Sequence, residues 1–201
     1  MDIIGDFATE DLDDMLALAF LCAHPTVNLL AVTVTPGSPA QIGVVREVLS
    51  RCERSGIPVG SFKPDHPHDS VNPFHYRLLG RVTPASPDAR GHEVLARSLQ
   101  QSPAATIVTG APLSNLRAFL DNHPDTEIAR WVGQGGFAGA NVVPPQHQLP
   151  KLTGRITCPT FNFDGDIGAA HLLLSTPRVK LRHLVAKNVC HGVVYDNELQ
   201  S

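Results

Sequence analysis

The sequence predicts an α/β fold in which a mostly parallel sheet is flanked by helices. Short runs of branched apolar residues alternate along the chain with segments whose apolar residues recur at helical spacing. The strand candidates are apolar on both faces, which is typical of parallel strands covered by helices on either side. The chain has 201 residues, the length of one ordinary domain, so residues 1–201 are expected to form a single domain.

The first part of the chain alternates strands and helices. A short apolar strand is expected at residues 1–5. Residues 11–24 follow as a helix because their apolar side chains recur every three to four positions. Residues 28–35 (NLLAVTVT) are rich in β-branched residues, which predicts a buried strand. Residues 40–55 have the pattern of a second helix, and residues 57–60 have that of a brief strand.

The second part of the chain repeats this alternation. A helix is expected over residues 93–101, and a buried strand follows at residues 104–109. Residues 113–122 show helical periodicity again. The last three elements are a short strand at residues 130–132, a helix at residues 166–175 and an alternating strand at residues 179–186. Ligands of such sheets bind where the strands end, so the loops at those ends are the place to look for a site.

Composition narrows the classes of function. The chain is 42% hydrophobic and 17% charged, with a formal charge of −3, so neither a nucleic-acid-binding nor an anionic-membrane-binding surface is expected. No apolar run approaches the ~20 residues of a membrane helix, and the first residues lack the basic and apolar regions of a secretion signal. The four cysteines stand singly, which excludes a zinc ribbon or a CxxC redox motif. We therefore expect a cytoplasmic protein without nucleic-acid or membrane partners.

The strongest local signal is the turn GDFATEDLDD between the first strand and the first helix. It contains five carboxylates, at Asp6, Glu10, Asp11, Asp13 and Asp14. Asp11 could cap the helix, and acids in a first helical turn complement the helix dipole by about 0.3–1 kcal/mol each. Five acids in nine residues exceed that need, and a hard divalent cation would relieve their repulsion. Oxygen ligands alone favour calcium or magnesium over zinc.

This turn resembles the aspartate-rich amino-terminal motif of the nucleoside hydrolases of the inosine–uridine-preferring type. In that family a strand ends in DTDxGxDxDD or DTDPGxDD and an apolar helix follows, where this chain has GDFATEDLDDMLAL. Four further blocks are similar to segments of the family and occur in the same order. They are NLLAVTVTPGS (28–38), ATIVTGAPLSNL (105–116), GGFAGANVVP (135–144) and PTFNFDGD (159–166).

The resemblance implies a Rossmann-like nucleoside hydrolase fold and a metal-dependent enzyme that cleaves the N-ribosidic bond of a nucleoside or related ribosylated compound. In the family a bound calcium, for which magnesium is the alternative, holds a water and the ribose 2′- and 3′-hydroxyls. An aspartate takes the proton of that water as it attacks C1′. The bond breaks through an oxocarbenium-like sugar, which carboxylates stabilise. The family tends to dimers and tetramers, so a homodimer or homotetramer is expected.

Carried over residue by residue, the resemblance assigns three kinds of role. The catalytic residues would be Asp6 and Asp11. The metal ligands would be Asp6, Asp11, Asp14 and the backbone carbonyl near Gly110. The substrate-binding residues would be Asp13, Ser38, Asn141, Thr160, Asn162 and His191.

The chain departs from the family pattern in four places. A gapless alignment of the motif puts Phe7 where the catalytic aspartate belongs, and Asp6 lies one position away. Ser38 replaces an asparagine, and Thr160 replaces a glutamate that accepts a sugar hydroxyl. The carboxy-terminal histidine–aspartate pair of the family has no counterpart at the expected place. The carboxylates that could replace it are Asp164, Asp166 and Asp196.

These departures leave two alternatives to an enzyme. One is a protein that retains the ribose pocket and binds a nucleoside without turnover. The other is a structural subunit that contributes its acidic loop to an interface. Release of free ribose or base would separate the enzyme from the binding protein.

Residues 62–90 form a long segment rich in proline and histidine. We expect an ordered loop or lid, because the segment contains three aromatic residues. Its histidines could protonate a substrate base or contact phosphate, although surface histidines are the simpler interpretation. Its basic residues could favour a phosphorylated substrate. The histidines are His66, His68 and His75, and the basic residues are Lys63, Arg77 and Arg81.

Overall fold

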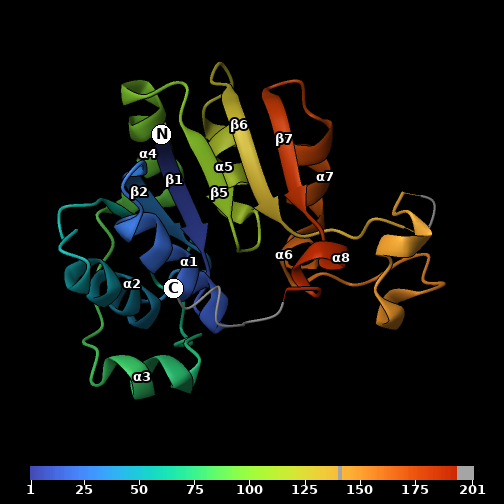
Figure 1. The fold of residues 1–201 in the computed structure, drawn as a ribbon. Coiled ribbons are helices and arrows are strands. Elements are labelled where there is room, and N and C mark those ends of the chain that lie inside the picture. The colour runs from blue at the N-terminus through green and yellow to red at the C-terminus, as the bar shows by residue number, and fades with distance from the viewer. Residues whose placement is uncertain (140–141, 194–201) are drawn as a thin grey trace.

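The computed structural model describes residues 1–139 and 142–193 and confirms the α/β prediction. Seven parallel strands form one sheet, and helices cover both of its faces (Figure 1). The strands are β1 (Asp2–Phe7), β2 (Asn28–Val34), β3 (Val59–Ser61), β4 (Ala89–Arg90), β5 (Thr106–Thr109), β6 (Ile128–Gln134) and β7 (Val179–Val185). The helices are α1 (Leu12–Ala23), α2 (Pro39–Arg51), α3 (Pro73–Leu79), α4 (Gly91–Gln101), α5 (Ser114–Asn122), α6 (Phe161–Asp164), α7 (Ile167–Ser175) and α8 (Lys187–Cys190), with short 3-10 turns η1 (Pro145–His147) and η2 (Pro150–Leu152).

The strand order β4-β3-β2-β1-β5-β6-β7 places β1 at the centre of the sheet. The chain runs from β1 to one edge and then crosses back to β5 on the other side of β1. The loops after β1 and β5 therefore leave the sheet in opposite directions, and a crevice opens between them at the carboxyl ends of the strands. Asp6 lies near the end of β1, level with Thr33 of β2 and Thr109 of β5.

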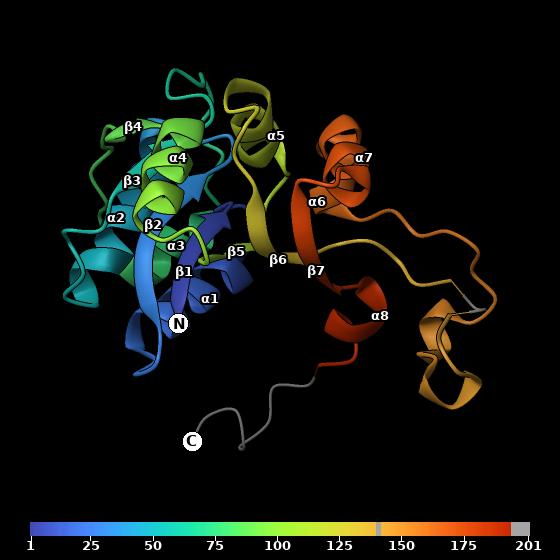
Figure 2. The same cartoon turned by 90° about the horizontal axis from the view of Figure 1, so that it is seen from above.

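Two apolar cores lie on the two faces of the sheet. Helices α1 and α2 cover one face, and α4, α5 and α7 cover the other (Figure 2). Trp131 of β6 is the only tryptophan of the chain and is completely buried. Its indole N–H donates to the Thr109 hydroxyl over 3.0 Å, and its ring centroid lies 6.3 Å from that of Phe163. The end of β6 is thereby tied to the end of β5.

The segment expected as a loop or lid at residues 62–90 is ordered and includes α3 and β4. It is fastened to the acidic turn through Asn72, whose backbone N–H donates to the Thr9 carbonyl and whose side-chain amide donates to the Glu10 carbonyl, both over 3.0 Å. The Thr9 hydroxyl donates back to the Ser70 carbonyl over 3.2 Å. The segment therefore braces the acidic turn from outside.

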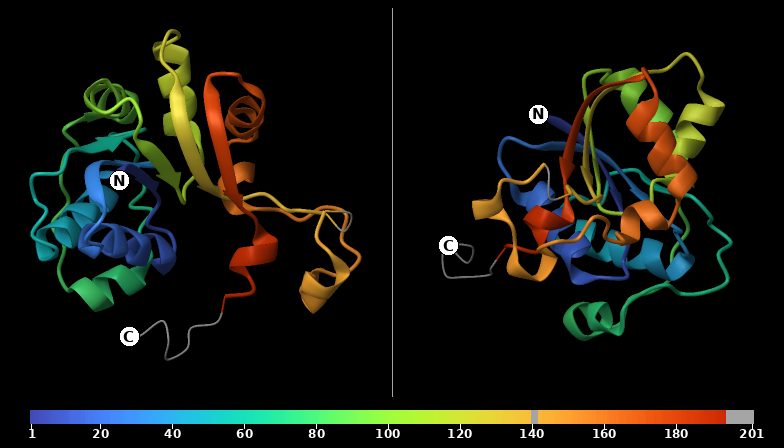
Figure 3. Two further views of the ribbon diagram at one scale, coloured as in Figure 1. Left: turned by 45° about the horizontal axis from the view of Figure 1, so that its top comes forward. Right: turned by 90° about the vertical axis from the view of Figure 1, so that its right-hand side faces the viewer.

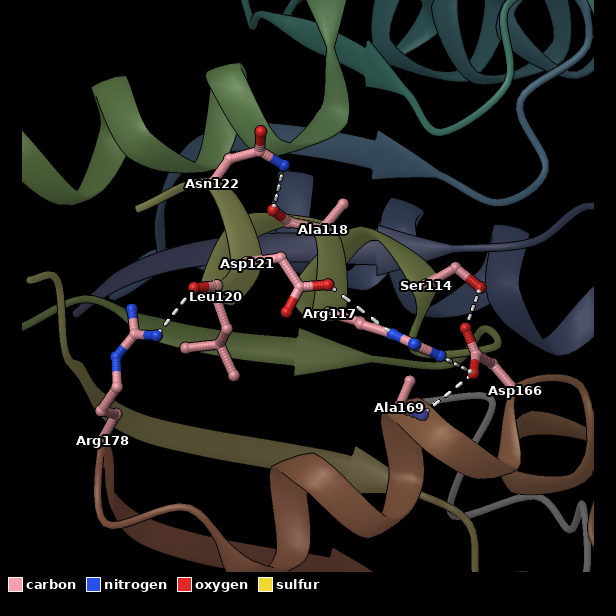
Figure 4. Close-up of polar contacts among 9 residues, drawn as sticks. All are labelled: Ser114, Arg117, Ala118, Leu120, Asp121, Asn122, Asp166, Ala169 and Arg178. Atoms are coloured by element: carbon pink, nitrogen blue, oxygen red, sulfur yellow. Dashed lines mark hydrogen bonds and ion pairs between the residues drawn. The ribbon is translucent and has the colours of Figure 1, made fainter. Parts of the chain in front are cut away.

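Asp166 begins α7 and fastens it to α5. Its carboxylate accepts hydrogen bonds from the Ala169 backbone N–H and the Ser114 hydroxyl, both over 2.9 Å, and pairs with Arg117 over 3.3 Å (Figure 4). At the other end of α5, the guanidinium of Arg178 donates a hydrogen bond to the Leu120 carbonyl (Figure 4). Asp166 thus caps α7 and links it to α5, which is a structural role.

The β7 edge of the sheet is less covered than the centre. Leu181, Leu184 and Val185 are exposed there, and η1 and η2 lie out beyond this edge (Figure 3). A partner subunit that covers this edge stays a prediction. No helix within residues 1–139 and 142–193 combines the length and the apolar character needed to cross a bilayer.

Candidate active site

A cavity of about 530 Å³ opens at the carboxyl ends of the central strands, where the strand order predicts a crevice. Its volume is in the range of small-molecule sites. The acidic turn and the end of β5 form one wall, and the segments that follow β6 and β7 form the other. The lining residues are Phe7, Ala8, Glu10, Asp11, Asp13, Asp14, Ala17, Val108, Thr109, Gly110, Gln134, Thr160, Phe161, Asn162, Lys187, Cys190 and His191.

Helix capping does not account for the acids of this wall. Asp11 occupies the N-cap position of α1, but its side chain forms no capping hydrogen bond. Asp13 accepts a hydrogen bond of 3.0 Å from the backbone N–H of Asp14. Glu10 is partly buried, and its pKa is raised by that burial and by Asp11, against the opposing effect of His66. The carboxylates therefore face the cavity at an electrostatic cost that capping does not offset.

Asp14 is the most buried carboxylate of the cavity wall, with 8% of its surface exposed. Its Oδ2 accepts a hydrogen bond of 2.9 Å from the Ala8 backbone N–H. Burial, and then the charge of Asp13, raise the pKa of Asp14 well above its usual value, and Asp6 and Asp11 add to this effect. Gly110 gives Asp14 its space, because a Cβ at residue 110 would lie 2.2 Å from Asp14 Oδ1.

We expect Gly110→Ala to destabilise the fold by about 1–3 kcal/mol, because the added methyl group must displace the Asp14 carboxylate. Chemical denaturation measures this directly. Gly56→Ala is the matched control, since a Cβ there meets nothing within 4 Å and should change stability by less than ~0.5 kcal/mol. Equal stability of the two variants would show that Asp14 does not depend on the glycine.

Asp6 lies behind the cavity wall and is completely buried. Its Oδ1 accepts hydrogen bonds from the Thr33 hydroxyl over 2.7 Å and from the Asn115 amide over 2.9 Å. Its Oδ2 has no hydrogen-bond partner within residues 1–139 and 142–193. Burial raises the pKa of Asp6 to about 7, even though both hydrogen bonds act to lower it.

The opposite wall contains two of the sequence-predicted sugar contacts. The Asn162 amide donates to the backbone carbonyl of Gln134 over 3.0 Å and also contacts the Gln134 side chain. The Thr160 hydroxyl accepts a hydrogen bond of 3.2 Å from the Gly136 backbone N–H. Asn162 and Thr160 are therefore held at the end of β6, facing the acidic turn across the cavity.

Some predicted site residues lie elsewhere. Ser38 caps α2, where its hydroxyl accepts from the Gln41 backbone N–H over 3.2 Å and donates to the Asp69 carbonyl. Asp164 Oδ2 accepts from the Thr160 backbone N–H over 3.1 Å and does not line the cavity. Asn141 and Asp196 fall outside the described residues. The histidines and basic residues singled out in residues 62–90 do not line the cavity either.

Gln134 and Lys187 line the cavity but were not among the predicted site residues. They lie at and just after the ends of strands whose neighbours become known only from the sheet register. Gln134 ends β6, level with Val185 of β7, and Lys187 begins α8 just after β7. A single polar residue after a strand gives no sequence signal of its own, because most such residues face water.

The acidic wall offers oxygen ligands of the kind that calcium or magnesium prefers. In the described part of the chain no three side chains of histidine, cysteine, aspartate or glutamate converge as a ready-made metal site. The orphaned, fully buried Oδ2 of Asp6 and the buried carboxylate of Asp14 nevertheless fit a hard cation, since both are ionised only at a cost that a cation would offset. Backbone and water oxygens would complete its coordination.

The chain is similar to several known proteins. The chain is 29% identical to an uncharacterized protein of Aquifex aeolicus over 98% of its own length and 68% of that protein. It is 33% identical to a pyrimidine-specific ribonucleoside hydrolase of a Shewanella strain, but covers only 45% of that protein and matches it over 63% of its own length.

Solved structures show the same fold. An inosine-uridine preferring nucleoside hydrolase of Bacillus anthracis superimposes with a TM-score of 0.69 at 20% identity, over 100% of this chain and 69% of that one. A plant nucleoside hydrolase superimposes with a TM-score of 0.71 at 22% identity, over 98% and 63%. The sequence profile of the inosine-uridine preferring nucleoside hydrolases matches residues 4–201, so the chain belongs to this family.

Proposed function

We propose that the protein hydrolyses the N-ribosidic bond of a ribosylated compound with the help of a divalent cation. The observation that carries this proposal is one cavity in which Asp11, Asp13 and Asp14 face Asn162 across the ends of the central strands. Membership of the nucleoside hydrolase family supports the reaction type. The ribonucleoside hydrolase relative supports a nucleoside as the substrate class.

The cation would be held by Asp14, the orphaned oxygen of Asp6 and the backbone carbonyl near Gly110. When bound, it would lower the pKa of a water and orient that water and the sugar diol. Calcium is the first choice and magnesium the second, since all proposed ligands are oxygens.

The side chains of the cavity have separate tasks in this proposal. Asp13 and Asn162 hold the ribose hydroxyls, and Thr160 offers a hydroxyl beside them. Asp11 has a carboxylate that faces the cavity without a capping hydrogen bond, and it accepts the proton of the attacking water. The water oxygen forms a bond to C1′ while the bond from C1′ to the base nitrogen breaks, and the departing base takes a proton from solvent, which balances the proton passed to Asp11. The products are free ribose and free base.

A second candidate is a protein that binds the sugar without turnover. The observation that favours it is the position of Phe7, whose ring lines the cavity where the gapless alignment of the family motif places the catalytic aspartate. The carboxylate of Asp6 does not line the cavity, so it could replace that aspartate as a cation ligand but not as the acceptor of a proton from water.

One experiment separates the candidates. The purified chain is incubated with uridine, cytidine and inosine in the presence of calcium, and free base and reducing sugar are measured together. We expect equal amounts of both products, and none when the cation is chelated. Calcium-dependent thermal stabilisation without product would favour the binding protein, because a ligand of the folded state raises its stability by mass action. Neither product nor stabilisation would refute the proposed site.

A further inference from the structure

Basic side chains lie at the wall of the cavity opposite the acidic turn. Lys187 and His191, at the two ends of α8, both line the cavity. Lys151 of η2 is close enough to His191 to act on its ionisation. Partial desolvation, and then the positive charges of Lys151 and Lys187, lower the pKa of His191. Three basic groups from two separate segments are thus brought to one place.

The chain brings these two segments together by packing. A Cβ added at Gly192, directly after His191, would lie 3.3 Å from Leu149 Cδ2, so η2 and the end of α8 are in contact. The basic group therefore comes from the fold, since residues 151 and 187 are far apart in the sequence.

None of the three side chains has an anionic partner among the described residues. No salt bridge there includes Lys151, Lys187 or His191. Lys187 donates one hydrogen bond, of 2.6 Å, to the carbonyl of Pro159, directly before Thr160 of the cavity wall, and two N–H donors remain. Clustered cations without counter-charges repel one another, and an anion placed between them would remove that repulsion.

We propose that Lys187, His191 and Lys151 form an anion subsite, which takes a negatively charged group of the ribosylated substrate. This inference rests on the proposed function, because it assumes that the acidic wall holds the sugar. A sugar fixed at the acidic wall would direct its 5′ group or its base toward the basic wall. The subsite would suit a 5′-phosphate or a carboxylate on the base, and two ammonium groups beside an imidazole donor match the phosphate better.

The test compares uridine, uridine 5′-monophosphate and orotidine as substrates, with KM and kcat measured separately for each. We expect KM for the monophosphate to be about tenfold lower than for uridine, as charge-assisted hydrogen bonds to the added anion predict. Preference for orotidine instead would assign the subsite to a carboxylate of the base. Equal KM values for all three compounds would overturn the proposal.

Variants of Lys187 separate charge from structure. Lys187→Met should remove the preference for the charged substrate, while Lys187→Arg should retain it. Lys180→Met is the control, because Lys180 lies at the other end of β7 and pairs with Glu127 there. A charged-substrate preference that survives Lys187→Met would refute the subsite.

The inference can fail or hold independently of the proposed reaction. If no compound is hydrolysed, thermal shifts with uridine and with its monophosphate still measure binding. A larger shift with the monophosphate that Lys187→Met abolishes would support the subsite although the proposed reaction had failed. Equal shifts would refute it.

Discussion

Replacement of Asp14 by asparagine is expected to abolish calcium-dependent stabilisation and to lower the rate of base release about a thousandfold. Asp14 is the buried carboxylate that borders the cavity, and the loss of one preorganised charge at such a site costs about 10²–10³ in rate. The asparagine has the same shape, and its side-chain oxygen can still accept the hydrogen bond from Ala8. The fold should therefore survive the substitution.

The same variant should be at least as stable as the natural chain when calcium is absent. Burial and neighbouring acids raise the pKa of Asp14, so its charged form is disfavoured, and an amide removes that cost. Thermal unfolding with and without calcium measures both effects. Asp125→Asn, at an exposed site beyond α5, serves as the control. A variant of Asp14 that keeps the full calcium shift would contradict the proposed ligand.

The second large effect concerns the pH dependence of stability. Asp6 has a folded-state pKa of about 7, against a usual value of 3.8, so between these values the folded state holds a proton that the unfolded state has lost. Without calcium, the free energy of unfolding should therefore decrease as pH rises from about 4 to about 7. The displacement of this pKa corresponds to roughly 4 kcal/mol at about 1.4 kcal/mol per pH unit.

Asp6→Asn tests whether Asp6 causes this pH dependence of the free energy of unfolding. The variant lacks the titrating group, so its stability curve should be flatter over the same pH range, whatever constant cost the new amide adds. Denaturant unfolding at several pH values provides the curves. Calcium should flatten the curve of the natural chain as well, because the cation favours the ionised carboxylates and displaces their protons. An unchanged slope in Asp6→Asn would assign the titration to another group.

Much of the fold could be predicted from hydrophobic pattern alone. The central strands are continuous apolar runs bounded by turns, and the helices between them show clear periodicity, so both were located within a few residues. Strand β4, with two residues, and helices α6 and α8, with four each, are too short to produce a period. Helix α3 was missed because the proline-rich stretch around it predicted a loop.

The acidic wall could be predicted because its residues are consecutive in the sequence. The opposite wall could be predicted only in part, since it is assembled from Gln134, Asn162 and the start of α8 by the register of β6 and β7. The contact between Asp6 and Asn115 spans 109 positions and depends on the order of β1 and β5. Ser38 shows the converse: a residue that stands where the family has an asparagine has a capping role that its neighbours Pro39 and Gln41 already suggest.

The position of Trp131 gives the protein a built-in optical reporter. The indole N–H is bound to Thr109, directly before Gly110, and the ring lies near Phe163, directly after Asn162. The tryptophan fluorescence of the chain comes from this one indole, which contacts Thr109 of one wall and lies near Phe163, the residue after Asn162 of the other. Titrations with cation or sugar can therefore be followed by tryptophan emission without any label.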